Sequence, residues 1–134
     1  MGTGTISVSL TNQQLDDARA AFLADWEHGS GLVTFAAWIE EALCDHATRT
    51  PTERAAHRVT ASGQTRSFRI TDDTRAMIES AHSSDCAAGQ WVSLSAWAAA
   101  AITAATTTAR QRGPLPAPPG RLPGRLPARK ETSQ

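Results

Sequence analysis

The side chains that could perform catalysis or bind a metal ion in this chain are few and scattered. The candidates are two cysteines and four histidines: Cys44, Cys86, His28, His46, His57 and His82. They lack the close spacing of zinc ligands. The chain also has no Ser-His-Asp grouping and no glycine-rich phosphate-binding loop. We therefore expect no metal site, no cofactor and no enzymatic activity.

Hydrogen-bonding side chains alternate with apolar ones along two short segments. Residues 6–11 read ISVSLT and residues 66–71 read RSFRIT, an offset of 60. Such alternation is typical of a strand with one buried face. The polar sides of the two predicted strands carry hydroxyl groups and one guanidinium, on Thr5, Ser7, Ser9, Thr65, Ser67 and Arg69.

A ten-residue pattern also occurs twice. Residues 34–43 read TFAAWIEEAL and residues 93–102 read SLSAWAAAAI, an offset of 59. Thr34 and Ser93 are typical helix N-caps, and the apolar residues that follow them recur at helical spacing. Each segment therefore predicts a helix, and the sequence indicates a strand-helix-helix unit built twice.

The first helix of each unit is less regular in sequence. We expect one to begin at Thr11 or Asn12 and the other at Thr71, because their side chains suit N-cap positions. Residues 82–90 are predicted to be a loop or a frayed helix end. The tryptophans, the phenylalanines and Met77 are expected to lie in the core.

Charge is balanced overall but unevenly distributed along the 134 residues. Residues 1–45 contain seven acidic residues and a single arginine, whereas residues 46–71 contain five arginines and one glutamate. Residues 110–134 hold six basic residues and one acid, and six of the seven prolines lie at 114–127. Such a proline-rich segment is typical of an extended, disordered tail. The predicted organisation is a first unit at 1–45, a polar basic connector at 46–64, a second unit at 65–109 and a disordered basic tail at 110–134.

One unit is too short to bury an adequate core, and a lone strand leaves its backbone groups unpaired. We therefore expect a mainly α fold with a two-stranded antiparallel β-ribbon. In this fold the two β-α-α units form a pseudo-dimer and four helices cover one face of the ribbon. The connector is long enough for the strands to pair within one chain or between two chains.

This pattern resembles the ribbon-helix-helix family of DNA-binding proteins, of the Arc/MetJ type, over residues 6–44 and 66–106. The resemblance implies that the uncovered ribbon face enters the major groove of double-stranded DNA. It assigns base reading to the six residues of that face, Thr5, Ser7, Ser9, Thr65, Ser67 and Arg69. It also assigns phosphate contacts to the helix starts at Thr34 and Ser93, while Arg66, at a strand end, is a further phosphate candidate.

Residues 18–43 also resemble a domain of small plasmid-partition, centromere-binding proteins. The sequence therefore favours a sequence-specific DNA-binding protein that serves plasmid partition or represses its own operon, with extra phosphate contacts from the tail and the arginines of 46–71. The expected partners are DNA and, through the tail, a partition ATPase. The alternatives are an antitoxin whose tail binds a toxin, and a protein-interaction module that never contacts DNA. A cytoplasmic protein without a membrane segment is expected.

Overall fold

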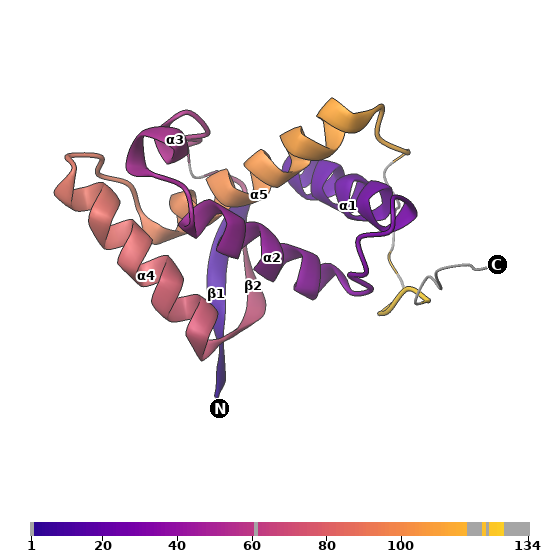
Figure 1. The fold of residues 1–134 in the computed structure, drawn as a ribbon, viewed down its shortest axis with the longest axis horizontal. Coiled ribbons are helices and arrows are strands. Elements are labelled where there is room, and N and C mark those ends of the chain that lie inside the picture. The colour runs from indigo at the N-terminus through magenta and orange to yellow at the C-terminus, as the bar shows by residue number, and fades with distance from the viewer. Residues whose placement is uncertain (1, 61, 118–121, 123, 128–134) are drawn as a thin grey trace.

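The computed structural model describes residues 2–60, 62–117, 122 and 124–127. Within these residues the chain is mainly helical, with a two-stranded antiparallel sheet and five helices (Figure 1), so the predicted ribbon is confirmed. The elements are β1 (Thr3–Leu10), α1 (Asn12–Glu27), α2 (Phe35–Ala47), α3 (Pro51–Ala55), β2 (Gln64–Thr71), α4 (Asp72–Ala87) and α5 (Leu94–Arg112).

The two strands pair within one chain, over their full lengths. Ser7 lies directly opposite Ser67, and Arg69 lies opposite Thr5. The connector brings β2 back to β1 through Gly63, which has a positive φ of 84° and lies so close to Leu10 that a Cβ atom would overlap its backbone. Glycine is therefore required where the two strands first meet.

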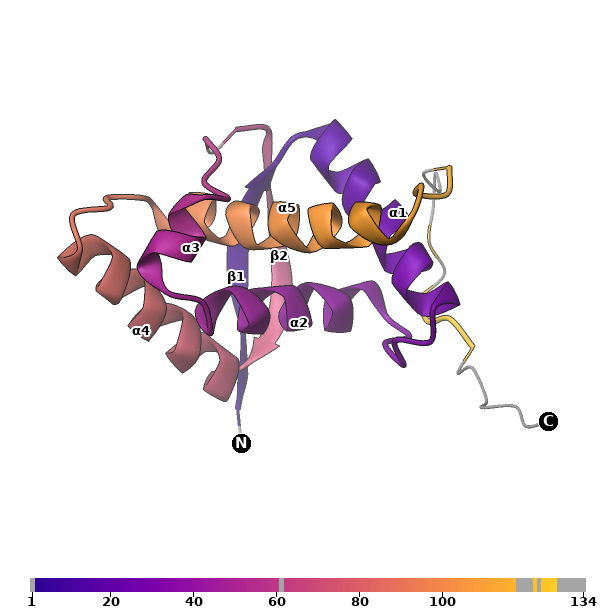
Figure 2. The same ribbon diagram turned by 45° about the horizontal axis from the view of Figure 1, so that its top comes forward.

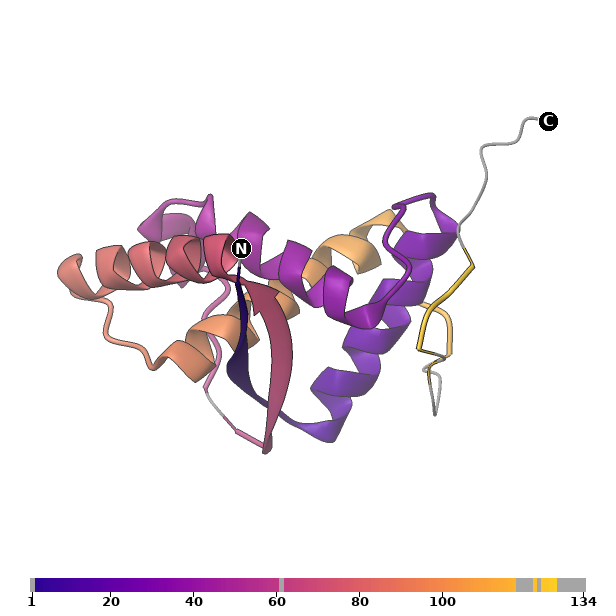
Figure 3. The ribbon, with the colours of Figure 1, turned by 90° about the horizontal axis from the view of Figure 1, so that it is seen from below.

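All the packing helices lie on one side of the ribbon. Figure 2 shows α2 and α5 side by side across the strands, and Figure 3 shows the ribbon from below with α4 on one side and α1 on the other. Helix α1 packs on α5, and α4 packs on α2. Helix α5 also contacts β1, and its buried alanines allow that close approach because they have almost no side chain to separate the backbones.

The helix starts agree with the predicted caps. The side chains of Thr11, Thr34, Thr71 and Ser93 each accept a hydrogen bond from the backbone amide three residues on. The side chain of Gln14 in turn accepts from the Thr11 amide, which completes a capping box. Each cap satisfies an amide that has no partner inside its helix.

Two sequence predictions about the second unit are wrong. The predicted loop at 82–90 is helical up to Ala87, because Asp85 in the last turn of α4 is buried and bonded to α3 and α5. Met77 and Trp91 were expected in the core, yet they are 39% and 74% exposed. Met77 lies on the outer side of α4 beside the buried Ile78, and Trp91 lies in the loop before α5.

An aspartate-tryptophan hydrogen bond recurs in the two halves of the chain. The Trp38 indole donates to Asp25 at 2.7 Å, and the Trp97 indole donates to Asp85 at 3.0 Å. Arg112 forms an ion pair with Asp25, and Arg54 forms one with Asp85. Each aspartate-tryptophan bond joins the end of a unit's first helix to that unit's second helix. The arginine that pairs with each aspartate comes from outside the unit.

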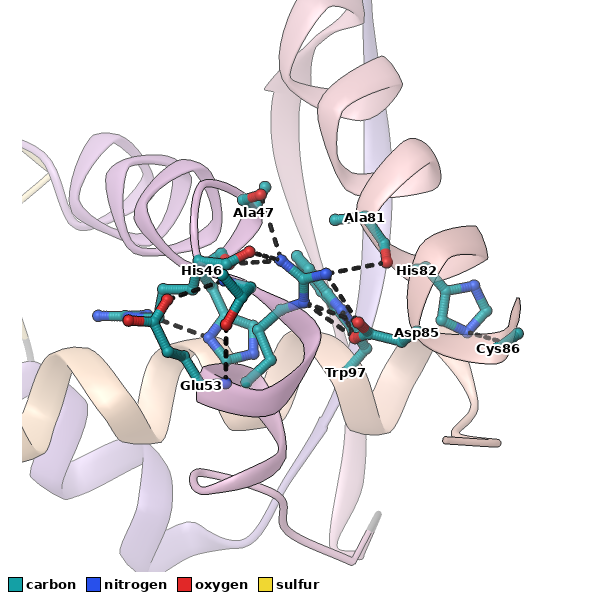
Figure 4. Close-up of polar contacts among 11 residues, drawn as sticks. His46, Ala47, Glu53, Ala81, His82, Asp85, Cys86 and Trp97 are labelled. Atoms are coloured by element: carbon teal, nitrogen blue, oxygen red, sulfur yellow. Dashed lines mark hydrogen bonds and ion pairs between the residues drawn. The ribbon is translucent and has the colours of Figure 1, made fainter. Parts of the chain in front are cut away.

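The pair with Arg54 is fully buried, since both side chains are 3% exposed. Arg54 belongs to α3, a short helix within the predicted connector that the sequence analysis missed. Its guanidinium donates to Asp85 through Nε and Nη2, and to backbone carbonyls of Ala47, Arg49 and Ala81 (Figure 4). The connector is therefore fastened to both α2 and α4.

His46 lies against this ion pair. Its ring meets the Trp97 ring edge to face at a centroid distance of 4.9 Å, and Nδ1 accepts from Arg49 at 3.1 Å. Burial, together with the positive charges of Arg49 and Arg54, lowers the pKa of His46 to about 3. The imidazole is therefore neutral at neutral pH.

The tail departs from the predicted disordered segment where the structure describes it. Helix α5 continues to Arg112, and Leu126 is 7% exposed, with its amide donating to the Val33 carbonyl at 2.6 Å. The Trp26 indole donates to the Pro127 carbonyl at 2.9 Å. Leucine side chains anchor this segment to the folded part of the chain, although its proline content predicted an extended, disordered tail. Residues 118–121, 123 and 128–134 of the predicted tail lie outside the described residues.

Two features are absent from the described part of the chain. None of its helices combines the length and apolar character needed to cross a membrane. No group of three or more histidine, cysteine or acidic side chains there is arranged to hold a metal ion.

Asp85→Asn should lower the free energy of unfolding by about 3–5 kcal/mol, because it leaves the buried Arg54 charge without a counter-ion. Asp17→Asn is the matched control, since Asp17 pairs with Arg110 at the surface and should cost no more than about 1 kcal/mol. Urea unfolding of both variants measures the difference. Equal losses would show that the buried pair does not stabilise the fold.

The stability of the fold should fall as the pH is lowered below about 6.5, the ordinary pKa of histidine. Between that value and the folded pKa of about 3, unfolded His46 binds a proton that folded His46 does not. This costs up to about 1.4 kcal/mol per pH unit. Urea unfolding at pH 7, 6 and 5 should show a shallower pH dependence in His46→Gln than in wild type. His28→Gln, which replaces an exposed histidine, should keep the wild-type dependence.

Candidate nucleic-acid interface

The outer face of the ribbon carries all six residues that the sequence proposes for base reading. Alternation along β1 and β2 places them on the face opposite the buried side chains of Ile6, Val8, Leu10 and Ile70. Five of the six are exposed and Ser9 is half-buried. The register forms three cross-strand pairs: Thr5 with Arg69, Ser7 with Ser67, and Ser9 with Thr65.

The chemistry of this face is hydrogen bonding with one charged group. Five hydroxyl side chains can each donate or accept, and they carry no charge. Arg69 adds a planar fork of donors at one end of the patch. The two ends of the face are therefore unlike, because Ser9 and Thr65 at the other end carry only hydroxyl groups.

The starts of α2 and α5 flank the ribbon. The ring of Phe35, the first residue of α2, lies 6.0 Å from the ring of Phe68 in β2. At the other side, the hydroxyls of Ser95 in α5 and Ser9 in β1 are 2.9 Å apart. The phosphate candidates Thr34 and Ser93 cap these same helices, so they lie beside the ribbon face. Ser93 is exposed and Thr34 is half-buried.

Arg66, the third phosphate candidate, lies on the inner side of β2, opposite Val8. Its guanidinium turns toward the end of the ribbon, where it donates to Asn12 at 3.1 Å and to Gln64 at 3.4 Å. Arg66 therefore links the start of α1 to β2, and the residue is half-buried.

Two residues that the sequence analysis missed hold the Arg69 end of the ribbon. Arg75 in α4 donates to the Thr5 carbonyl at 2.6 Å. Glu40 in α2 accepts from the Thr71 amide, the Thr71 hydroxyl and the Thr74 hydroxyl. Burial alone would raise the pKa of Glu40, but these hydrogen bonds outweigh it and the pKa is lowered. Arg75 lies outside the repeated segments, and Glu40 occupies a position of segment 34–43 whose counterpart at the offset of 59 is Ala99, so the repeat marked neither residue.

The arginines expected to contact phosphate are partly used within the protein. Arg54 is buried in its pair with Asp85. Arg110 pairs with Asp17 and Arg112 with Asp25, so the end of α5 neutralises part of the acidic first unit. Arg58 in the connector and Arg69 in β2 are exposed. Asp17 and Asp25 thus form their ion pairs with α5 and not with residues of the ribbon face.

Comparison of the chain with protein-family models, curated proteins and solved structures gave no match.

Proposed function

We propose that this protein binds double-stranded DNA in a sequence-specific manner by inserting its β-ribbon into the major groove. The observation that carries the proposal is the outer ribbon face, on which six hydrogen-bonding side chains gather, five of them exposed and the sixth, Ser9, hydrogen-bonded to Ser95 at the start of α5. A two-stranded ribbon fits the major groove, where each base pair presents a distinct pattern of donors and acceptors.

The register supports a pseudo-dimer of two ribbon-helix-helix units. Ser7 and Ser67 are equivalent under the sequence offset of 60, and they face each other at the centre of the ribbon. A two-fold axis through that pair exchanges β1 with β2, α1 with α4, and α2 with α5. The contacts of α1 with α5 and of α4 with α2 agree with this exchange, as do the two aspartate-tryptophan bonds.

In this proposal the two halves contact DNA unequally. Arg69 is the residue suited to bridge O6 and N7 of guanine, whereas its equivalent in the first unit is Ser9. The starts of α2 and α5, at Thr34 and Ser93, contact phosphates on either side of the groove through their free amides and positive dipole ends. Arg66 adds a phosphate contact only if its guanidinium leaves Asn12.

The role we propose is plasmid partition or repression of the protein's own operon in the cytoplasm. An antitoxin is a weaker candidate, because Leu126 and Pro127 of the tail are bound to the first unit and a toxin would have to displace them. A protein-interaction module without DNA affinity is the alternative of another class.

Gel-shift titration against fragments of the protein's own upstream region tests the proposal. We expect binding at about 50 mM salt that weakens steeply as salt is raised, because each phosphate contact releases counter-ions. Absence of binding at that salt concentration rules out the DNA-binding function and favours the interaction module.

Arg69→Ala should reduce discrimination between the preferred site and a site changed at one base pair by about 1–3 kcal/mol, the value of a bidentate arginine-guanine contact. Arg69→Lys is the matched variant, since it keeps the charge but lacks the planar fork. It should lose most of the discrimination while retaining affinity for random DNA. Equal losses on specific and random DNA would contradict base reading by Arg69.

A further inference from the structure

A segment from outside each unit contacts the loop that precedes that unit's second helix, and each of these segments carries an exposed arginine. We call residues 28–34, between α1 and α2, the first loop, and residues 88–93, between α4 and α5, the second loop. The segments Leu32–Val33–Thr34 and Trp91–Val92–Ser93 correspond at the offset of 59. The arginines are Arg125 at the first loop and Arg58 at the second.

At the second loop the contact is made by the side chain. Arg58 lies after α3 in the connector, and its Nη2 donates to the Trp91 carbonyl at 2.5 Å. The residue is exposed. Trp91 is two residues before the helix cap Ser93, so the charge of Arg58 is held beside the start of α5.

At the first loop the contact is made by the backbone. The Leu126 amide donates to the Val33 carbonyl at 2.6 Å, and the buried Leu126 side chain anchors the segment. Trp26 holds the following residue through the Pro127 carbonyl. Arg125 is adjacent to Leu126 and exposed, and consecutive Cα atoms are about 3.8 Å apart, so its backbone lies beside the start of α2.

Both loops lead into helices that begin beside the ribbon. Helix α2 begins against β2 through Phe35 and Phe68, and α5 begins against β1 through Ser95 and Ser9. The loops themselves contain no basic residue except His28. Each loop therefore receives its positive charge from another part of the chain, one from the connector and one from the tail.

We infer that Arg58 and Arg125 are the residues that contact the DNA phosphates on the two sides of the ribbon. This inference rests on the proposed function. On this inference, docking of the tail brings a positive charge to the acidic first unit. Arg54, Arg110 and Arg112 differ from these two arginines because they are paired with aspartates.

The test is the dependence of DNA affinity on salt, measured with the full chain on a specific and a random duplex. Arg58→Ala and Arg125→Ala should each lower the slope of log affinity against log salt by about 0.9, and each should weaken binding about eightfold at about 0.1 M salt. The loss should be the same on both duplexes, because phosphates carry no base sequence. Arg110→Ala removes the same charge from a residue paired with Asp17, and its slope should equal the wild-type slope.

Leu126→Ala tests whether Arg125 acts from its docked position. Loss of the buried anchor should release the segment and reproduce most of the slope change of Arg125→Ala. A slope that falls in Arg125→Ala but not in Leu126→Ala overturns the docked placement. Thermal unfolding followed by circular dichroism checks that each variant is folded at the assay temperature.

The failures are distinguishable. If the wild type binds neither duplex, the proposed function fails and this inference falls with it. If the wild type binds DNA but Arg58→Ala and Arg125→Ala keep the slope of the wild type, or if Arg110→Ala loses as much as they do, the inference alone is overturned.

Discussion

The pairing of β1 with β2 is the interaction on which the rest of this structure depends. The two strands form the whole sheet in the described part of the chain, so each supplies the only ladder available to the other. The register aligns the apolar residues under the helices and the six polar ones on the opposite face. A slip of one residue would exchange the two faces of the slipped strand, which the buried Ile6, Val8 and Leu10 prevent.

Around the ribbon, the same polar connection is made twice but with different burial. Asp25 and Asp85 each bind a tryptophan of the following helix and an arginine from elsewhere. The pair with Arg54 is closed from solvent, whereas Arg112 is 45% exposed. Burial makes the second connection more costly to break, since a lone charge would remain in the core. The connector and the second unit are thus joined more firmly than the tail and the first unit.

The features predictable from sequence were those with a period or a local partner. Alternation gave the strands, and Thr34 and Ser93 cap their helices because the bonds they form are only three residues long. The unpredicted features depend on distant partners. Arg54 meets Asp85 across 31 residues, and Leu126 meets Val33 through a proline-rich segment. Nothing in the sequence distinguishes Arg54 from the exposed arginines of the connector, or Trp91 from the buried tryptophans. Only the tertiary structure shows that Arg54 is buried and Trp91 is exposed. For the candidate site, alternation identified the ribbon residues but not Arg75 or Glu40, which approach from other elements.

Because the two strands belong to one chain, dilution does not separate them, and the two halves of the ribbon need not be identical. Two separate chains that form such a ribbon lose it as their concentration falls, whereas strands joined by a connector meet at a fixed effective concentration. Folding of this chain is therefore independent of how many copies a cell holds. Linkage also frees each half to change alone, as the exchange of Ser9 for Arg69 between equivalent positions illustrates. The two ends of the ribbon face can therefore change independently of each other.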